Sequence, residues 1–302
     1  MKSLYPRFMN AFLQDHFSTF TDFQLLDTGD GFRLEQWGPY RLARPDPQII
    51  WNRHLDDNEW NACDARYELM GDRGGWNEIS KMPASWPVKY DVPGTDVRLA
   101  FKARLTPFKH TGIFAEQAAN WEWMAKKLEG KKGRKILNLF GYTGAASVTL
   151  TALGHGVTHV DASKPAIGWA KENQELNKLP ADSIRWILDD ASKFVMREIK
   201  RGQKYDGIVM DPPAFGHSPD GRTWKFNDDV PNLLADCVEL LTDDADFLIL
   251  NGYATNSSAI ALKNLLEDAT AKKKGTLEYG ELCLEQQDKR LISTGIFARW
   301  SR

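Results

Sequence analysis

Residues 135–145 read Lys-Ile-Leu-Asn-Leu-Phe-Gly-Tyr-Thr-Gly-Ala, and the organisation of the chain can be worked out from them. The apolar run 135–139 predicts a buried strand, and the small residues 145–153 predict a helix that ends before Gly154. Between them, Gly141 and Gly144 permit a tight turn that a ligand can approach closely, at a helix end with unpaired N–H groups. The turn matches neither G-x-x-x-x-G-K-[ST] nor G-x-G-x-x-G, so a phosphate loop and a dinucleotide fingerprint are disfavoured. Taken alone, such glycines are as often structural as functional.

The chain from about residue 111 onward alternates between helical and strand patterns. Further strands are expected at 157–160, 184–188, 205–210 and 247–250, and helices at 114–128, 165–177, 191–201, 230–241 and 257–271. Strands separated by helices of this length predict an α/β fold with a doubly wound, Rossmann-like parallel sheet. Two further strands, 277–284 and 292–300, follow without a helix between them. They predict a closing antiparallel hairpin and a sheet of seven strands.

Residues 1–105 differ in composition from the rest of the chain. Eight of the 14 prolines lie at or before Pro107, and five of the 11 tryptophans lie before residue 90. Short apolar runs bounded by turn residues predict a small β-rich N-terminal domain over 1–105, which we consider for substrate recognition, followed by a second domain over 106–302. The aromatic side chains of the first domain are more often core than a surface for stacking bases.

Composition excludes several classes of protein. No apolar run approaches the roughly 18 residues needed to cross a membrane, and the first residues have no signal-peptide pattern, so a cytoplasmic location is expected. Cys63, Cys237 and Cys283 lie far apart, which argues against disulfides and a cysteine zinc site. His155 and His159 do not share a helix face, so no metal is expected. The net charge of −2 gives no overall bias toward nucleic acid.

Acidic residues follow the second and third expected strands. Asp161 lies 20 residues after Gly141, where a carboxylate can bind the two hydroxyls of a ribose. Asp190 ends the third strand, where it could meet an adenine amino group, and Asp189 could serve equally. The alternative is that these residues cap helices. Asp161 or Ser163 would cap one helix, and Asp190 or Asp189 would cap the next. Three such features at the ends of three successive strands favour a ligand crevice.

Residues 211–215, Asp-Pro-Pro-Ala-Phe, follow the fourth expected strand. Two prolines fix the backbone and leave rigid carbonyls that can accept a hydrogen bond from a substrate N–H. Asp211 adds a carboxylate, and Phe215 adds a face on which a flat group can stack. A plain turn would explain the prolines but not the acid, the aromatic residue or the position. We therefore predict a catalytic site at Asp211, Pro212, Pro213 and Phe215.

These segments and the closing hairpin together resemble a class I S-adenosylmethionine-dependent methyltransferase. The similarity is strongest to the group that includes the bacterial large-subunit ribosomal RNA methyltransferases of the I and K types. Residues 111–117, Thr-Gly-Ile-Phe-Ala-Glu-Gln, resemble the segment that closes over the cofactor in that group. The resemblance extends over about 106–302 and is more specific for the methyl donor than for the acceptor. Residues before 106 do not resemble the PUA RNA-binding module that many of those enzymes carry.

The resemblance implies S-adenosyl-L-methionine as the cofactor. Phe140, Tyr142, Thr143 and Gly144 would line its methionine end. Asp161 would bind the ribose and Asp190 the adenine. Thr111, Phe114 and Gln117 would form a lid. The expected cofactor-binding residues are Thr111, Phe114, Gln117, Phe140, Gly141, Tyr142, Thr143, Gly144, Asp161, Ser163, Asp190 and Ala191.

Two features bear on the acceptor. Methylation of a pyrimidine C5 needs a cysteine, which this group places just after the fifth strand. Here the residues at that place, 250–253, read Leu-Asn-Gly-Tyr. Cys237 lies within an expected helix. A nitrogen acceptor is therefore favoured. Residues 211–246 hold nine acidic and two basic residues, which repels RNA from the expected active site. A basic cluster could instead flank the entrance and hold a strand; it consists of Lys126, Lys127, Lys131, Lys132, Arg134 and Lys135.

We therefore predict a methyltransferase that acts on a nitrogen of an RNA base, with ribosomal RNA as the model for its partner. A protein or small-molecule N-methyltransferase and a non-catalytic cofactor-binding adaptor remain as alternatives. An NAD-dependent oxidoreductase is disfavoured by the missing G-x-G-x-x-G and by the presence of Asp-Pro-Pro-Ala-Phe.

Overall fold

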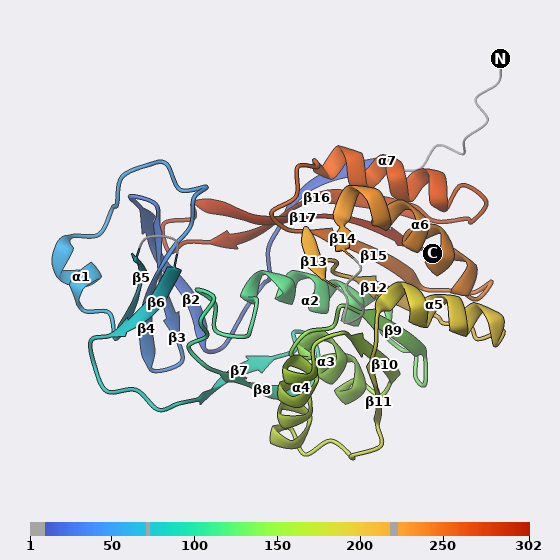
Figure 1. Cartoon of the computed structure of the whole chain (residues 1–302), viewed down its shortest axis with the longest axis horizontal. Helices are drawn as coiled ribbons and strands as arrows, with labels where there is room; N and C mark the ends of the chain where they lie inside the picture. Colours follow the sequence, from blue (N-terminus) through green and yellow to red (C-terminus); the bar gives the residue numbers. More distant parts are fainter. Residues whose placement is uncertain (1–9, 71–72, 218–222) are drawn as a thin grey trace. The chain divides into compact units, whose positions relative to one another are not determined.

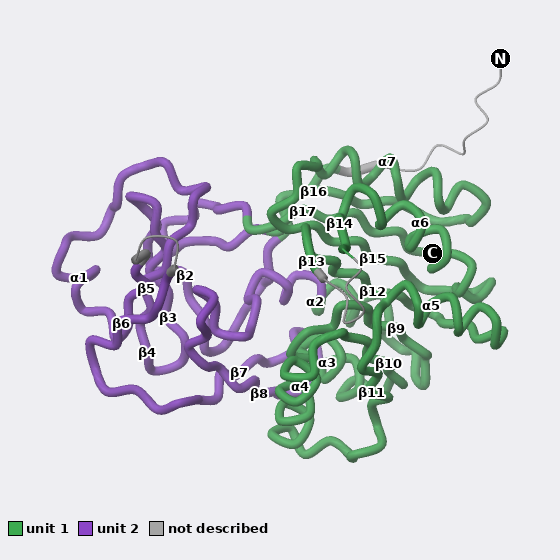
Figure 2. Tube along the Cα trace, in the orientation of Figure 1, with its two compact units in different colours: residues 1–15, 121–282, 294–302 green, residues 16–120, 283–293 purple. Residues whose placement is uncertain are grey.

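The computed structural model describes residues 10–70, 73–217 and 223–302, which form two compact units (Figures 1 and 2). The α/β unit contains the described residues up to Asp15 together with 121–282 and 294–302, and the β-rich unit contains 16–120 and 283–293. The sequence suggested a boundary near residue 105, whereas the chain passes from one unit to the other between Asn120 and Trp121.

An eight-stranded sheet forms the centre of the α/β unit (Figure 1). Its strands lie in the order β1, β16, β17, β15, β12, β9, β10, β11. The parallel strands are β9 (Lys135–Leu139), β10 (Gly156–Asp161), β11 (Ile184–Leu188), β12 (Gly207–Met210) and β15 (Phe247–Gly252). β16 (Thr276–Glu285) and β17 (Leu291–Ser301) form the closing hairpin, with β17 antiparallel to β15. The chain order reverses between β9 and β12, and ligands of such sheets bind outside the carboxyl ends of the strands at that point.

Helices cover the sheet as the alternating pattern predicts. α3 and α4 contact each other and the strands β10 and β11, while α5, α6 and α7 contact one another in succession (Figure 1). No helix in the described ranges is long and apolar enough to cross a membrane. The helices are α2 (Ala118–Lys127), α3 (Ala145–Ala152), α4 (Lys164–Leu176), α5 (Ala191–Lys200), α6 (Phe226–Leu240) and α7 (Ala259–Ala269).

The expected α/β sheet with a closing hairpin is confirmed, but it has eight strands and not seven. The additional strand is β1 (Asn10–Asp15), which pairs in parallel with β16 at the edge of the sheet. A buried Arg299 donates to the Asp15 carboxylate at 2.6 Å and fixes this edge. Part of the N-terminal region therefore belongs to the α/β unit.

Two predicted helices have different bounds in the structure. The expected helix 114–128 begins with a 3-10 turn, η1 (Ala115–Gln117), that precedes α2. The expected helix 230–241 begins earlier, because α6 starts at Phe226 and contains Pro231 in its second turn. A proline is most common in the first turn of a helix, and for this reason the pattern placed the helix start too late.

The β-rich unit contains two small sheets, as its turn-rich sequence predicts. Tryptophans 37, 60 and 86 are buried in it, so these rings are core and not a stacking surface. The five-stranded sheet consists of β2 (Phe23–Gly29), β3 (Phe32–Trp37), β4 (Tyr40–Pro45), β5 (Ala65–Met70) and β6 (Arg73–Glu78). The second sheet pairs β7 (Trp86–Asp91) with β8 (Arg98–Ala103), and a short helix α1 (Asp57–Asn61) joins β4 to β5.

Candidate active site

The turn between β9 and α3 has an unusual backbone. Phe140, Tyr142 and Gly144 have φ angles of +57°, +50° and +79°. For residues other than glycine, this left-handed region is rarely populated and costs about 1–3 kcal/mol per residue. The turn keeps this shape only if surrounding contacts impose it, and such strain is common where a ligand binds.

The Asp161 carboxylate provides one of those contacts. It accepts a hydrogen bond from the Tyr142 N–H at 2.8 Å and from the Ser163 N–H at 2.7 Å. Burial raises the pKa of Asp161, and the two N–H groups partly oppose the rise. The cap of α4 is Ser163, whose hydroxyl accepts from the Ala166 N–H at 3.3 Å. Asp161 is therefore tied to the turn, and the capping alternative applies to Ser163.

A buried polar network that is not among the sequence-based predictions lies against the turn at Gly141. Asn138 Nδ2 donates to Ser147 Oγ at 2.9 Å, and Ser147 Oγ lies 2.9 Å from His159 Nδ1. All three side chains are buried, and burial lowers the pKa of His159 to about 3, so its ring is neutral. Asn173 Nδ2 donates to the carbonyl of Thr143 at 2.8 Å and holds the far end of the turn.

Both glycines of the turn are needed for packing. A Cβ atom on Gly141 would lie 2.4 Å from His159 Cε1, and a Cβ on Gly144 would lie 2.8 Å from the Cβ of Ala170. Contacts shorter than 3.0 Å do not occur for real Cβ atoms, so neither site accepts a side chain without movement. The close approach is to the protein itself, and it fixes the path of the turn.

Residues after β11 form a cap and an ion pair. Asp190 caps α5 by accepting from the Lys193 N–H at 3.0 Å, and Ala191 is the buried first residue of that helix. Asp189 pairs with Arg197, and its N–H donates to the carbonyl of Asp161 at 3.1 Å. The capping alternative therefore describes Asp190, and an adenine contact stays a prediction.

The Asp-Pro-Pro-Ala-Phe loop follows β12, beside the first turn. The Pro213 carbonyl accepts from Trp224 Nε1 at 2.8 Å, and the buried Trp224 ring lies 5.1 Å from the ring of Phe140. One of the two prolyl carbonyls thus has a partner inside the protein, where the sequence analysis assigned both to a substrate. Phe215 is 56% exposed and opens a small hairpin of β13 (Phe215–His217) and β14 (Thr223–Lys225). Pro212 is buried and Asp211 is half-buried.

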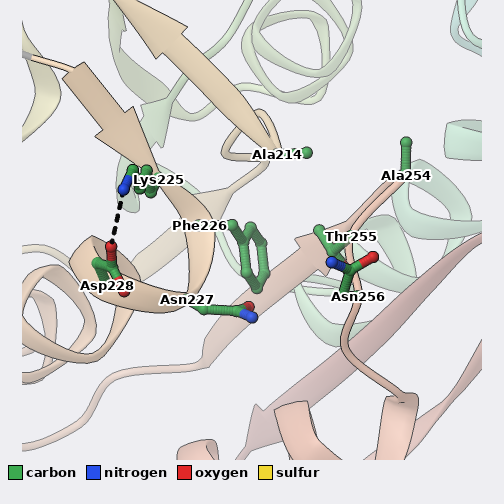
Figure 3. A pocket seen from close by; sticks show the side chains of 8 residues that line it. All are labelled: Ala214, Lys225, Phe226, Asn227, Asp228, Ala254, Thr255 and Asn256. Atoms are coloured by element: carbon green, nitrogen blue, oxygen red, sulfur yellow. Dashed lines mark ion pairs between the residues drawn. The ribbon is translucent and has the colours of Figure 1, made fainter.

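A hollow of about 290 Å³ lies next to this loop (Figure 3). It is lined from three directions: by the loop after β12, by the start of α6 and by the loop after β15. The lining residues are Ala214, Lys225, Phe226, Asn227, Asp228, Ala254, Thr255 and Asn256.

The charge clusters do not lie where the sequence suggested. Lys131 Nζ lies 2.6 Å from Asp246, and Arg134 pairs with Asp246 at 3.0 Å and with Asp206 at 3.7 Å. These residues precede β9, β12 and β15 and are at the amino ends of the strands, whereas the candidate site is at the carboxyl ends. The basic cluster therefore does not flank the entrance. The acidic run is also divided, because 243–246 lie at the amino end; Asp220 and Arg222 are outside the described residues.

The expected lid residues belong to the β-rich unit. Thr111 is buried and its hydroxyl donates to the carbonyl of Ile113 at 3.4 Å. The ring of Phe114 lies 5.4 Å from that of His110, and Gln117 Oε1 accepts from Asn120 Nδ2 at 2.7 Å.

Neither a thiol nor a metal cluster accompanies the site in the part of the chain that the structure describes. Cys63, Cys237 and Cys283 are all buried, and burial raises the pKa of the Cys237 thiol strongly. No group of three or more His, Cys, Asp or Glu among the described residues could hold a metal ion.

Comparison with known proteins adds a family and a solved relative. The sequence model of the family described as S-adenosylmethionine-dependent methyltransferase matches residues 56–288. The crystal structure of the SAM-dependent methyltransferase from Agrobacterium tumefaciens is 39% identical to this chain, with a TM-score of 0.91. That similarity covers 98% of this chain and 95% of the other.

Curated proteins with similar sequences are named for an activity on ribosomal RNA. The ribosomal RNA large subunit methyltransferase K/L of Shewanella sp. strain MR-4 is 34% identical over 188 residues, which are 59% of this chain and 24% of that protein. The protein of the same name from Shewanella loihica is 32% identical over 213 residues, which are 68% of this chain and 28% of that protein. This chain thus spans about a quarter of the length of these relatives.

Proposed function

The chain belongs to the family of S-adenosylmethionine-dependent methyltransferases, and from this membership we propose that it methylates a nitrogen atom of an RNA base, such as a base of ribosomal RNA. The observation that carries the proposal is the meeting of two loops at the switch point of the sheet. The turn after β9, held by Asp161, suits the cofactor, and the loop after β12, with its exposed Phe215, suits a flat acceptor.

The residues around the first turn fit S-adenosyl-L-methionine. Gly141 and Gly144 keep the turn close to the sheet, and the Asp161 carboxylate is fixed by two N–H groups, which suits it to accept from ribose hydroxyls as well. Phe140, Tyr142 and Thr143 would lie along the methionine end, with Asp190 and Ala191 near the adenine. When bound, the cofactor supplies a methyl group attached to a positively charged sulfur. After the transfer, the sulfur is part of a neutral thioether, which leaves.

The residues after β12 are proposed to hold the acceptor. Phe215 would stack on the ring, and Asp211 would accept a hydrogen bond from the N–H that gives up its proton on methylation. In-line methyl transfer depends mainly on the alignment of the two reactants, which these fixed groups provide. A base inside a duplex cannot reach such a site, so it must be unpaired or flipped out.

A nitrogen acceptor fits the buried state of the cysteines. Attack on a pyrimidine C5 position requires a thiolate next to the base. Cys237 lies inside α6, and its raised pKa keeps it as the thiol.

Ribosomal RNA is encountered in the cytoplasm, which is the location we propose.

The experiment is methyl transfer from labelled cofactor to ribosomal RNA from a strain that lacks the protein. We expect label in RNA, on a base nitrogen, and a loss of about 5- to 150-fold with Phe215→Ala because base stacking contributes about 1–3 kcal/mol. Phe12→Ala removes an aromatic ring of similar exposure on the edge strand β1 and should change nothing. Label in protein or in a small molecule would overturn the RNA assignment. Binding of the cofactor without any transfer would favour the adaptor.

A further inference from the structure

The hollow beside the Asp-Pro-Pro-Ala-Phe loop is joined to it by backbone and side-chain contacts. The Phe226 N–H donates to the carbonyl of Ala214 at 3.1 Å, one residue from the Pro213 carbonyl that accepts from Trp224. The segment that leads into α6 and the proposed acceptor loop are therefore joined by two hydrogen bonds. A group held in the hollow would be fixed relative to Asp211 and Phe215.

The polar groups that line the hollow are mainly neutral. Asn227, Thr255 and Asn256 offer amides and a hydroxyl around the ring of Phe226 (Figure 3). The two charged residues, Lys225 and Asp228, have opposite signs and lie 3.9 Å apart. A cationic lysine or arginine side chain would meet no unpaired carboxylate among the lining residues, whereas a neutral ring with hydrogen-bonding edges would meet suitable partners.

The Asn227 side chain is held in one orientation. Ser257 Oγ donates to Asn227 Oδ1 at 2.8 Å, which turns the amide oxygen toward Ser257 and leaves the Nδ2 group as the donor offered to a ligand. The loop that carries Ser257 is itself constrained, because Ala254 has a φ of +51° and Thr255 Oγ1 accepts from the Ser257 N–H at 3.4 Å. Strain at a residue other than glycine is typical of ligand-binding segments.

We propose that this hollow is a base-reading subsite, in which Asn227 donates to a ring nitrogen or carbonyl oxygen of the acceptor base and Asn256 contacts the same edge. The inference rests on the proposed function and goes further, because it names the residues that select the base. Asparagine side chains are among those that hydrogen-bond to base edges in nucleic-acid complexes. None of the residues that line the hollow is among those expected to hold the cofactor.

The test compares three variants of the full chain. Asn227→Ala should reduce kcat/KM for RNA methylation by about 5- to 150-fold, because it leaves one polar atom of the bound base without its partner. Asn227→Asp keeps the shape but replaces the donor with a carboxylate, and it should lose at least as much. Asn264→Ala, which removes an exposed asparagine on α7, is the matched control and should leave the rate unchanged. Binding of S-adenosylhomocysteine, measured by calorimetry, should be the same in all three.

The outcomes separate this inference from the function on which it rests. If the wild-type protein methylates RNA and Asn227→Ala and Asn227→Asp do so at the same rate, the subsite is wrong and the function stands. If the wild-type protein labels a basic protein and Asn227→Asp increases that labelling, a cationic side chain occupies the hollow and both are wrong. A loss of cofactor binding in Asn227→Ala, equal to its loss of rate, would also overturn the subsite.

Discussion

Replacement of Gly141 by alanine tests whether the turn after β9 depends on the network beneath it. The new Cβ would lie 2.4 Å from Cε1 and 2.5 Å from Nδ1 of His159, and 3.0 Å from Asn138 Nδ2. His159 cannot easily move away, because Ser147 holds its Nδ1 and the ring of Trp186 lies 4.7 Å away. The φ angle of Gly141 is not positive, so the substitution acts through contact and not through backbone conformation.

The size of the effect follows from the distances. Ordinary contacts begin near 3.4 Å, so the turn must move by about 1 Å to relieve the clash at 2.4 Å. Such a movement would lengthen the 2.8 Å bond from Tyr142 N–H to Asp161 beyond hydrogen-bonding range. We expect about 1–3 kcal/mol of lost stability from overpacking. The lost contact to a charged group adds a 10- to 100-fold weaker affinity for S-adenosylhomocysteine, which corresponds to about 1.5–3 kcal/mol.

The assay is thermal unfolding together with calorimetric titration of S-adenosylhomocysteine, in the Gly141→Ala variant, in His159→Ala and in the double variant. Removal of the ring makes room for the new methyl group, so the double variant should lose less than the sum of the two single losses. Gly168→Ala, on an exposed position of α4 with nothing within 4 Å, controls for the added methyl group and should stabilise the helix by about 0.5–1 kcal/mol. Unchanged affinity in Gly141→Ala, or strictly additive losses, would refute the reasoning.

Three further predictions concern the same unit. Asp161→Ala should weaken binding of S-adenosylhomocysteine by about 10- to 100-fold without unfolding the chain; a Kd within twofold of the wild-type value would show that the carboxylate does not meet the ribose. His159 has a pKa lowered from 6.5 to about 3, so the unfolded chain binds a proton between these values that the native state rejects. The contribution of His159 to the free energy of unfolding is complete above pH 6.5 and is lost as the pH falls, by up to about 4–5 kcal/mol. The unfolding free energy of His159→Gln should therefore fall less steeply with acid than that of the wild type. Equal slopes in acid would contradict a buried neutral ring. The double change Lys126→Ala and Lys132→Ala, at exposed positions near the amino ends of the strands, should leave the salt dependence of RNA methylation unchanged, and a shallower slope would mean that this surface binds the phosphates after all.

Most elements from residue 135 onward could be predicted closely because their signals are local, whereas the short strands β13 and β14 were not predicted. Apolar runs such as 135–139 and 184–188 alternate with amphipathic segments, and the strand bounds agree with β9 and β11. The strand β1 gave no such signal. Its sequence, Asn-Ala-Phe-Leu-Gln-Asp, alternates weakly, and its partner β16 is more than 250 residues away. Pairing at that distance depends on the finished sheet, which local patterns do not describe.

The polar network next to the turn has a signal in the sequence that is not part of the turn motif. Asn138 and His159 are polar residues inside the apolar strands β9 and β10, where a buried polar group needs a partner. Ser147 lies on α3, so only the folded sheet brings the three together. Asparagine and histidine within otherwise apolar central strands therefore indicate a buried hydrogen-bond network, although not its third member.

The charge clusters were misjudged for a geometric reason. Sequence proximity to a motif does not give proximity in space, because a residue before a parallel strand and a residue after it lie at opposite ends of the sheet. Lys131 precedes β9 and Asp246 precedes β15, so both lie at the amino end and pair with each other at 2.6 Å. Charges near a parallel sheet should be assigned to one of its two ends before they are compared with a site.

The two halves of the candidate site lie on either side of the point where the chain order reverses. Loops after β9 and β12 diverge there, because one leads to α3 and the other to the β13–β14 hairpin and α6. Trp224 spans the gap: its Nε1 donates to the Pro213 carbonyl, and its ring packs 5.1 Å from that of Phe140. Tryptophan suits this position because it combines a large apolar ring with a single donor. The turn proposed for the cofactor and the loop proposed for the acceptor thus share one buried side chain, which links their positions.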